Sequence, residues 1–410
     1  MRVEMDMKTH WDFDLNQPLF FILCALCVKS LRSLRLKKTI MKKYYYKICA
    51  IFLFALLSSL TYSQSVRLFA GTYTEKGQKG FYIFDLNREA GTFKVLSETD
   101  AGPDPSYFCI SKKRGLIYAA NEVMKFRGTN GGGVTTLSYE AKTGLAKKIN
   151  ELLVPAGGPC FISLSPAENY LLTANYSSSS IAVVKLDPKG IPERVTDTIS
   201  FKGSEGTVSH PHMISFDPSG KKVYLTDLGL DRIVIYNFDE ASGKLKQIQN
   251  GIVNFSKGSG PRHFVFNASG TKMYVICELN STLSVFDVNL DGELKSMQTL
   301  TTLGEGFKGE NACADIHLGK NGKYLYGSNR GENTIVVFRT GTEGKLTPAG
   351  RISCGGNWPR NFVIDPSGKF ILVGNQKSGD ISLFKIDEKT GIPVNTSKSY
   401  KVETPSCLKF

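Results

Sequence analysis

Residues 260–279 read GPRHFVFNASGTKMYVICEL and have the pattern of a β-hairpin. Phe264 and Phe266 stand two residues apart behind Gly260-Pro261, which predicts a strand with one buried face. Asn, Ser and Gly at 267–270 are typical of a turn, and the apolar run 273–277 predicts a returning strand. Arg262 and His263 are unexpected at the start of this hairpin, because polar side chains are costly to bury.

The same hairpin pattern recurs along the chain. Similar segments occupy 104–122, 158–176, 210–229, 260–279, 312–331 and 358–377. They align on the anchor residues Pro105, Pro159, Pro211, Pro261, Cys313 and Pro359, which are spaced by 54, 52, 50, 52 and 46 residues. The third and fifth residues after every anchor are apolar, so each unit repeats the same buried strand.

Each repeat contains more than one hairpin. A third apolar strand follows, as at Ile233–Tyr236, and a weaker fourth strand comes after a Gly-Lys-Leu turn, as at Gly344–Leu346. Four antiparallel strands about every 50 residues are typical of a propeller blade. We therefore predict an all-β fold, a seven-bladed β-propeller of four-stranded antiparallel blades.

The two ends of the repeat region complete one another. Residues 404–410 resemble an isolated first strand, whereas 66–73 and 81–84 resemble a second and a third strand. We expect the N- and C-terminal strands to share one blade and so to close the ring. Closure would remove the open edges that a sheet otherwise exposes.

The segment before the repeats has a different character. Lys42, Lys43 and Lys47 precede the apolar run 48–60, and small residues follow it, which is the layout of a secretory signal peptide. We interpret 1–40 as a probable upstream mis-start, 41–63 as the signal peptide and 64–410 as the propeller. The protein is then exported, periplasmic or secreted, with no stable membrane anchor after cleavage. An uncleaved interfacial anchor is the alternative, and a leader without function would leave the protein cytoplasmic.

The formal net charge of +14 is not a sign of nucleic-acid binding. Ten Lys and Arg against four Asp and Glu precede residue 65, and the remaining lysines scatter over predicted turns rather than on one face. The six cysteines after residue 64 lack metal-ligand spacing. Buried free thiols are favoured over disulfides, which an exported protein could also form.

Two positions of each hairpin are expected at the same rim of the propeller. These are the residue after the anchor and the residue seventeen after it. The first register contains Ser106, Cys160, His212, Arg262, Ala314, Arg360 and Ser406. The second contains Glu122, Tyr176, Leu228, Glu278, Arg330 and Gln376. Charged groups concentrate in these registers, and convergent polar groups at one channel mouth indicate a functional site.

Several motifs together resemble the lactonase family of seven-bladed propellers, which includes propeller-type 6-phosphogluconolactonases and carboxymuconate cyclases. They are GTYT at 71–74, SHPH at 209–212, DLGLDR at 227–232, GPRH at 260–263, CEL at 277–279, ADIH at 314–317 and SNRG at 328–331. The resemblance covers essentially all of residues 66–410. One departure is Cys277, where the family usually has Asn before the glutamate.

The resemblance implies that His212, Arg262, Glu278 and Arg330 form the catalytic site. Glu278 is suited to general acid or base chemistry, the arginines to holding an oxyanion or an acidic group, and His212 to moving a proton. His210, His263, Arg360 and Glu122 are candidate substrate-binding residues. No metal or cofactor is required by this chemistry.

Structural roles remain open for the same residues. Glu278 and Arg330 could form an inter-blade ion pair, His210 could bond a loop, and His263 could orient the strand behind Arg262. We expect His317 to be packed in the core, because other blades place Cys, Ser or Val at its position.

The resulting prediction is metal-independent hydrolysis of a sugar lactone, 6-phosphogluconolactonase-like, in carbohydrate metabolism. The partner would be a small anionic or polar lactone. An exported protein would meet an unphosphorylated aldonolactone more readily than a phosphosugar. A carboxymuconate-type lactonizing cyclase and a non-catalytic exported binding module are the alternatives. The oligomeric state stays open.

Overall fold

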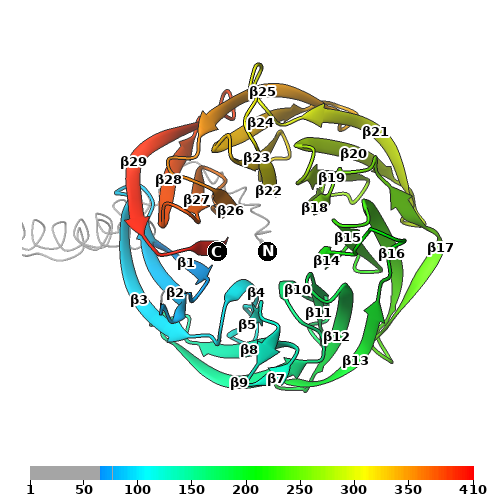
Figure 1. Cartoon of the computed structure of the whole chain (residues 1–410). Helices are drawn as coiled ribbons and strands as arrows, with labels where there is room; N and C mark the ends of the chain where they lie inside the picture. Colours follow the sequence, from blue (N-terminus) through cyan, green and yellow to red (C-terminus); the bar gives the residue numbers. More distant parts are fainter. Residues whose placement is uncertain (1–64, 76) are drawn as a thin grey trace, which may run out of the picture. The chain divides into compact units, whose positions relative to one another are not determined.

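The computed structural model describes residues 65–75 and 77–410. These residues form a seven-bladed propeller of four-stranded antiparallel sheets (Figure 1), as the repeat pattern predicted. The segments 1–40 and 41–63 lie outside the described residues. In the described part of the chain, no helix is long and apolar enough to cross a membrane.

In six blades the strands follow the chain from the centre of the ring outward, and in the closing blade the last strand of the chain is the innermost. The closing blade contains β1 (Ser65–Thr72), β2 (Gly80–Asn87), β3 (Thr92–Asp100) and β30 (Pro405–Lys409). The next contains β4 (Pro105–Ser111), β5 (Leu116–Asn121), β8 (Gly132–Tyr139) and β9 (Ala146–Val154). It is followed by a blade of β10 (Pro159–Leu164), β11 (Tyr170–Asn175), β12 (Ser180–Leu186) and β13 (Pro192–Ser200).

Four further blades complete the ring. They consist of β14 (Pro211–Phe216), β15 (Lys222–Asp227), β16 (Arg232–Asp239) and β17 (Lys244–Asn254); β18 (Pro261–Phe266), β19 (Lys272–Cys277), β20 (Thr282–Val288) and β21 (Leu294–Thr301); β22 (Ala312–Leu318), β23 (Tyr324–Arg330), β24 (Thr334–Thr340) and β25 (Leu346–Ser353); and β26 (Pro359–Ile364), β27 (Phe370–Asn375), β28 (Asp380–Ile386) and β29 (Pro393–Lys401).

The predicted closure of the ring is confirmed. The closing sheet has the order β3-β2-β1-β30, so the last strand of the chain is its innermost strand. Ala70 pairs with Leu408 across β1 and β30, in antiparallel register. One sheet therefore joins the two ends of the described chain.

A tyrosine in the second strand links each of four blades to the next. Its hydroxyl donates to the carbonyl oxygen of a glycine in a turn of the following blade. The four pairs are Tyr118–Gly190 at 2.7 Å, Tyr224–Gly292 at 2.7 Å, Tyr274–Gly344 at 3.1 Å and Tyr326–Gly391 at 2.9 Å. These tyrosines are almost fully buried, so the bond satisfies a hydroxyl inside the apolar layer between blades.

One hairpin was not expected from the repeat. The strands β6 (Lys125–Phe126) and β7 (Thr129–Asn130) are inserted between β5 and β8. This insertion accounts for the longest anchor spacing. Phe126 is buried against the backbone of Gly133, where a Cβ atom would meet its ring, and so holds the hairpin on the blade.

The six cysteines of the propeller are free thiols, as favoured from the sequence, and all but the partly exposed Cys109 are buried.

Candidate active site

The residue after each anchor occupies a β-bulge. In β18 the register shifts between Pro261, which pairs with Cys277, and His263, which pairs with Ile276, so Arg262 has no partner across the ladder. The same shift occurs after Pro105, Pro159, Pro211 and Pro359. A bulge turns the side chain of its extra residue out of the regular alternation. This local geometry sets the first register apart from the rest of the strand.

Glu278 lies between two arginines. Its Oε2 accepts a hydrogen bond of 2.8 Å from Nε of Arg262 and lies 2.7 Å from Nη2 of Arg330. The side chains of Arg262 and Arg330 are only 3% and 6% exposed and that of Glu278 is 19% exposed, so the interaction is weakly screened by water. The inter-blade ion pair of Glu278 and Arg330, left open from the sequence, is present, and Arg262 of the same hairpin as Glu278 joins it.

This arrangement controls protonation. Burial alone would raise the pKa of Glu278, but the charges of Arg330 and Arg262 outweigh it and lower the pKa from 4.5. Burial, with the charge of Arg262 added, lowers the pKa of Arg330 to about 10. Glu278 and Arg330 are therefore both charged near neutral pH.

Each arginine keeps one terminal nitrogen outside these interactions. The hydrogen bonds of Arg262 to Glu278 and Ala314 use Nε and Nη1, and those of Arg330 to the backbone of β22 use Nε and Nη2. Among the residues that the structure describes, Nη2 of Arg262 and Nη1 of Arg330 thus remain for a ligand. Two guanidinium donors beside a fixed carboxylate are suited to an oxyanion.

His212 is a buried neutral imidazole. Burial lowers its pKa well below 6.5, and the charges of Arg262 and His263 act in the same direction. Within 65–75 and 77–410, its Nδ1 is a buried atom without a hydrogen-bond partner. Buried polar atoms are rarely left unpaired, so this nitrogen is a candidate contact for a bound molecule or water.

Aromatic rings form a layer beside His212. The ring of Phe161 stacks on Tyr107 at 4.2 Å between centroids, and His263 meets Phe161 edge-on at 5.5 Å and His212 at 5.1 Å. Tyr107, Phe161 and His263 belong to β4, β10 and β18, three of the first strands around the centre of the ring. This layer therefore lies next to the charged cluster on the inner strands.

The candidate substrate-binding residues Arg360 and Glu122 lie in the same electrostatic environment. Glu122 accepts a 2.8 Å hydrogen bond from the hydroxyl of Tyr73, and its Oε2 is 3.9 Å from Nη2 of Arg360. Arg360 also lies over the ring of Tyr73, 5.3 Å from its centroid. The charge of Arg360 helps to lower the pKa of Glu278, after Arg330 and Arg262.

The other two candidates, His210 and His263, are engaged by protein groups. His210 stacks on Tyr176 with centroids 4.2 Å apart, and its Nδ1 is 3.1 Å from the carbonyl oxygen of Tyr176. His263 is 4% exposed, and its Nδ1 is 2.8 Å from Oδ1 of Asp315. These contacts favour the alternative interpretations, in which His210 bonds a loop, here the turn at Tyr176, and His263 orients the strand behind Arg262.

His317 is not the packed core residue expected from the sequence. Its side chain is 35% exposed, and its Nε2 is 3.0 Å from Oδ2 of Asp315. Its ring lies against Phe362, with centroids 4.8 Å apart. The hydrogen bond to a buried carboxylate explains why a polar residue is found here.

Trp358 is a site residue that the sequence did not reveal. It has a left-handed backbone with φ of 67°, a conformation that Asp104 and Thr404 also adopt directly before the anchors of their blades. The guanidinium carbon of Arg330 is 5.5 Å from its ring centroid, and Nζ of Lys377 is 3.2 Å from it. Its position directly before the anchor Pro359, where the other blades have Asp, Gly, His, Ala or Thr and no other aromatic carbocycle, was the available signal.

Further unpaired polar atoms occupy the two registers. Among the described residues, the hydroxyl of Ser106 and Oε1 of Gln376 are buried without a hydrogen-bond partner, as is Nδ1 of His212. Their gathering in the registers of Arg262 and Glu278 indicates a site for a polar ligand. No three His, Cys, Asp or Glu side chains of the described chain are grouped as a metal site requires.

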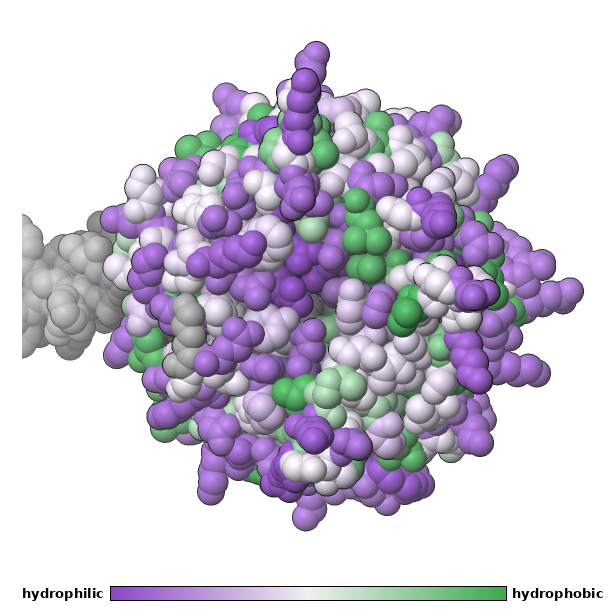
Figure 2. Space-filling model, viewed as in Figure 1, coloured by the Kyte–Doolittle hydropathy of each residue, from purple (hydrophilic) through white to green (hydrophobic). Residues whose placement is uncertain are grey.

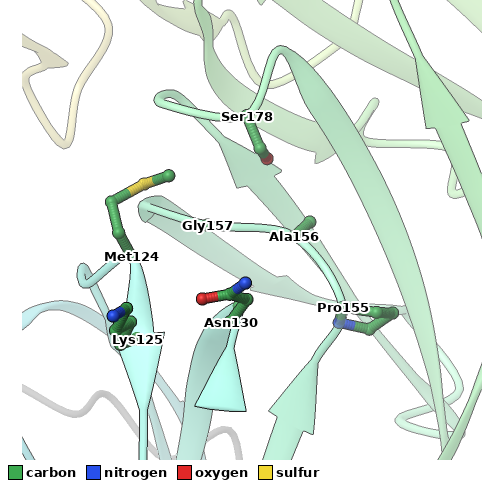
Figure 3. Close-up of a pocket in the computed structure, with 8 residues that line it drawn as sticks. Met124, Lys125, Asn130, Pro155, Ala156, Gly157 and Ser178 are labelled. Carbon is green, nitrogen blue, oxygen red and sulfur yellow. The ribbon is translucent and has the colours of Figure 1, made fainter. Parts of the chain in front are cut away.

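A pocket of about 480 Å³ adjoins the inserted hairpin (Figure 3). Lys125 and Asn130 come from the hairpin, and Met124 directly precedes it. Ala156 and Gly157 precede β10, and Ser178 follows β11. Met124 follows Glu122 of the second register by two residues. Figure 2 shows one face of the molecule, with hydrophilic residues around its centre and hydrophobic residues in small separate patches.

This combination of fold and site defines a known class of protein. Residues 67–410 match the family described as "Lactonase, 7-bladed beta-propeller", and the chain belongs to that family.

Two curated relatives and one solved structure share most of the chain. A 6-phosphogluconolactonase of Bacillus subtilis is 29% identical over 351 residues, which cover 83% of this chain and 97% of that protein. A 6-phosphogluconolactonase of Formosa agariphila is 30% identical over 83% of this chain and 100% of its own length. The structure of a periplasmic gluconolactonase of Pseudomonas aeruginosa superposes with a TM-score of 0.79 at 30% identity, covering 84% of this chain and 98% of that one.

Proposed function

We propose that the protein hydrolyses a sugar lactone, with His212 as the general base and Arg262 and Arg330 as the oxyanion site. The observation that carries the proposal is the buried Glu278 between the two arginines, beside a neutral imidazole with an unpaired nitrogen. The lactonase relatives support a lactone as substrate, and the gluconolactonase structure supports a sugar lactone in particular.

In the proposed reaction the arginines bind the carbonyl oxygen, and His212 carries one proton. The carbonyl oxygen of the lactone accepts hydrogen bonds from Nη2 of Arg262 and Nη1 of Arg330. His212 takes a proton from water as the new C–O bond forms, and the two guanidinium groups stabilise the resulting oxyanion. When the bond from the carbonyl carbon to the ring oxygen breaks, His212 returns the proton to that oxygen. The product is the open hydroxy acid, whose carboxyl group ionises in neutral solution.

Glu278 has a different role in this proposal from a proton carrier. Its pKa is lowered by two arginines, so its carboxylate is a weak base. A fixed negative charge here offsets the repulsion between the two guanidinium groups and aims them at one point. The pKa of His212 is lowered too, but its Nδ1 has no partner in the described chain, so we assign to His212 the general acid or base chemistry that the sequence suggested for Glu278.

We also propose that the protein is exported. The signal-peptide pattern at 41–63 motivates this, and a periplasmic gluconolactonase among the solved relatives supports it. The substrate would then be a lactone present outside the cytoplasm.

An acid-release assay tests the hydrolysis. We expect purified protein to accelerate the opening of glucono-1,5-lactone or its 6-phosphate above the spontaneous rate, measured as acid released at constant pH. Well-folded protein that accelerates neither reaction would contradict the proposal and favour the cyclase or the binding module.

The contact between Trp358 and Lys377 suggests where a phosphate would bind. Lys377 is exposed and lies over the Trp358 ring, whose other close cation is Arg330 of the oxyanion site. If the 6-phosphate is a substrate, we expect Lys377→Gln to raise its KM roughly tenfold, the scale of one charge-assisted hydrogen bond, and to leave glucono-1,5-lactone unaffected. Steady-state kinetics with both lactones measure this.

Lys369→Gln is the matched control, because Lys369 is also exposed and its Nζ is 3.2 Å from Glu388. Equal changes for both lactones in Lys377→Gln, or the same change in the control, would contradict a phosphate contact at Lys377.

A further inference from the structure

The beginning of β22 holds both arginines through its backbone. Nε and Nη2 of Arg330 donate to the carbonyl oxygens of Ala312 and Cys313, at 3.2 and 2.9 Å. Nη1 of Arg262 donates to the carbonyl oxygen of Ala314, at 2.5 Å. Three successive peptide carbonyls thus fix two guanidinium groups that come from different blades. We call residues 312–314 the arginine cradle.

The carbonyl groups of the arginine cradle can accept these bonds because the pairing of β22 with β23 is interrupted by a bulge. The register shifts between Cys313, which pairs with Asn329, and Ile316, which pairs with Gly327. Ala314 occupies the position at which other blades carry His212, Arg262 or Arg360. Its small side chain, fully buried, leaves room for the arginines beside the backbone.

Asp315 ties the cradle to the strands on both sides. Its carboxylate is 2.8 Å from Nδ1 of His263 in β18 and accepts from Nδ2 of Asn361 in β26. The backbone nitrogen of Asp315 donates to Oγ of Ser328 at 3.0 Å. His317 completes the set, with Nε2 at 3.0 Å from Oδ2. Asp315, which is 3% exposed, is therefore bonded to residues of three first strands, its own and the two beside it.

The hydrogen bond to Asp315 also sets the orientation of His263. Burial and the charge of Arg262 lower the pKa of His263 to about 4, although Asp315 acts in the opposite direction. The neutral ring donates from Nδ1 to Asp315, so its Nε2 has a lone pair 3.4 Å from Nη1 of Arg262. Asp315 therefore reaches Arg262 by two routes, through His263 and through the carbonyl of Ala314.

We propose that Asp315 is a positioning residue for the arginine pair, acting through His263 and the arginine cradle. The role of the pair in lactone opening rests on the proposed function above, whereas the geometry does not. A guanidinium group stabilises an oxyanion only over a narrow range of positions, and a displacement of about 1 Å is enough to lower a rate roughly 100-fold. Asp315 touches no reacting atom, so its effect is on placement.

Asp315→Asn tests the proposal. The amide cannot accept from all of these donors and removes the buried charge. We expect kcat to fall about 10- to 100-fold, the usual range for groups that orient a site from behind, with a smaller change in KM. We also expect the ¹⁵N-detected Nε–H signals of Arg262 and Arg330 to shift or broaden in the ligand-free protein. Arg262→Lys and Arg330→Lys assign these signals.

Asp380→Asn is the matched control. Asp380 is also a buried carboxylate, but its partners are Asn375, Ser378 and Ser382. If it lowers the melting temperature as much as Asp315→Asn and leaves both arginine signals and kcat unchanged, general destabilisation does not explain the effect. Unchanged arginine signals in folded Asp315→Asn would overturn the proposal, whether or not the protein is a lactonase.

A milder variant covers the case in which Asp315→Asn does not fold. His317→Asn removes one donor to Asp315 at a half-exposed position. We expect smaller shifts of the same two signals. An unshifted spectrum in this variant, with Asp315→Asn unfolded, would count against the proposal. If the signals shift but no lactone is opened by the unmodified protein, the positioning role stands and the proposed function fails.

Discussion

Replacing Glu278 by glutamine should lower kcat/KM for the lactone roughly 10²- to 10³-fold and destabilise the fold. The carboxylate bonds two arginines that are almost completely buried. Removing one member of a buried ion pair typically costs about 3–5 kcal/mol, because the remaining charge stays buried without its counter-ion. Here two positive charges would remain side by side without a counter-ion, because both arginines contact the same carboxylate oxygen, Oε2. Steady-state kinetics and thermal unfolding measure the two effects.

Glu122→Gln is the comparison for this variant. Glu122 also lies in the second register, but its Oε2 is 3.9 Å from Arg360, and its short contact is with the neutral Tyr73 hydroxyl. We expect a clearly smaller loss of kcat/KM and of stability. Equal losses of kcat/KM and stability in the two variants would contradict a special role for Glu278, because any carboxylate of the second register would then have the same effect. Full activity of Glu278→Gln would remove the arginine pair from the proposed mechanism.

The fold could be predicted because its signals are local and repeated. Alternating apolar residues such as Phe264 and Phe266 and turns such as Asp217–Gly220 specify a hairpin within 20 residues, and the repetition specifies the ring. The β6–β7 hairpin was missed because each of its strands has two residues, too few for a periodic pattern. Its stability depends on Phe126 and a contact with Gly133 that sequence spacing does not reveal.

The site was predicted in part. Aligning the repeats brought Arg262 and Glu278 to one rim, and the structure joins them at 2.8 Å. Asp315 was not singled out, because it lies in a strand where a buried carboxylate looks like an error in the pattern. Only the three-dimensional arrangement shows that His263 and Asn361, from two other blades, meet it there.

The histidines show why register alone is insufficient. His212 and His263 stand one and two residues after their anchors, and both are buried. His212 lies in the bulge after Pro211, and its Nδ1 has no hydrogen-bond partner in the described chain. The backbone of His263 pairs with Ile276 in the sheet, and its Nδ1 bonds Asp315. A shift of one residue therefore separates a group free to act on a ligand from a group that supports its neighbour.

Replacing His212 by asparagine should have the other large effect, a fall in kcat of about 10²- to 10⁴-fold, the range for loss of a general base. The active form of His212 is the neutral one, and its pKa is lowered by burial and then by Arg262 and His263. Activity should therefore persist as the pH falls below 6.5 and decline only near the lowered pKa of the folded protein. The measurement is kcat/KM as a function of pH for the unmodified protein and for His212→Asn, whose residual rate should lack this decline.

His210→Asn distinguishes the imidazole that reacts from the one that packs. His210 stacks on Tyr176 and bonds its backbone, so its loss should weaken the loop and change kcat far less than the loss of His212. Glu278 also has a lowered pKa and would give a decline on the acid side if it were the base. A decline that survives in His212→Asn and disappears in Glu278→Gln would assign the proton transfer to Glu278. The opposite result assigns it to His212, because in that case the carboxylate serves only to hold the two arginines in place.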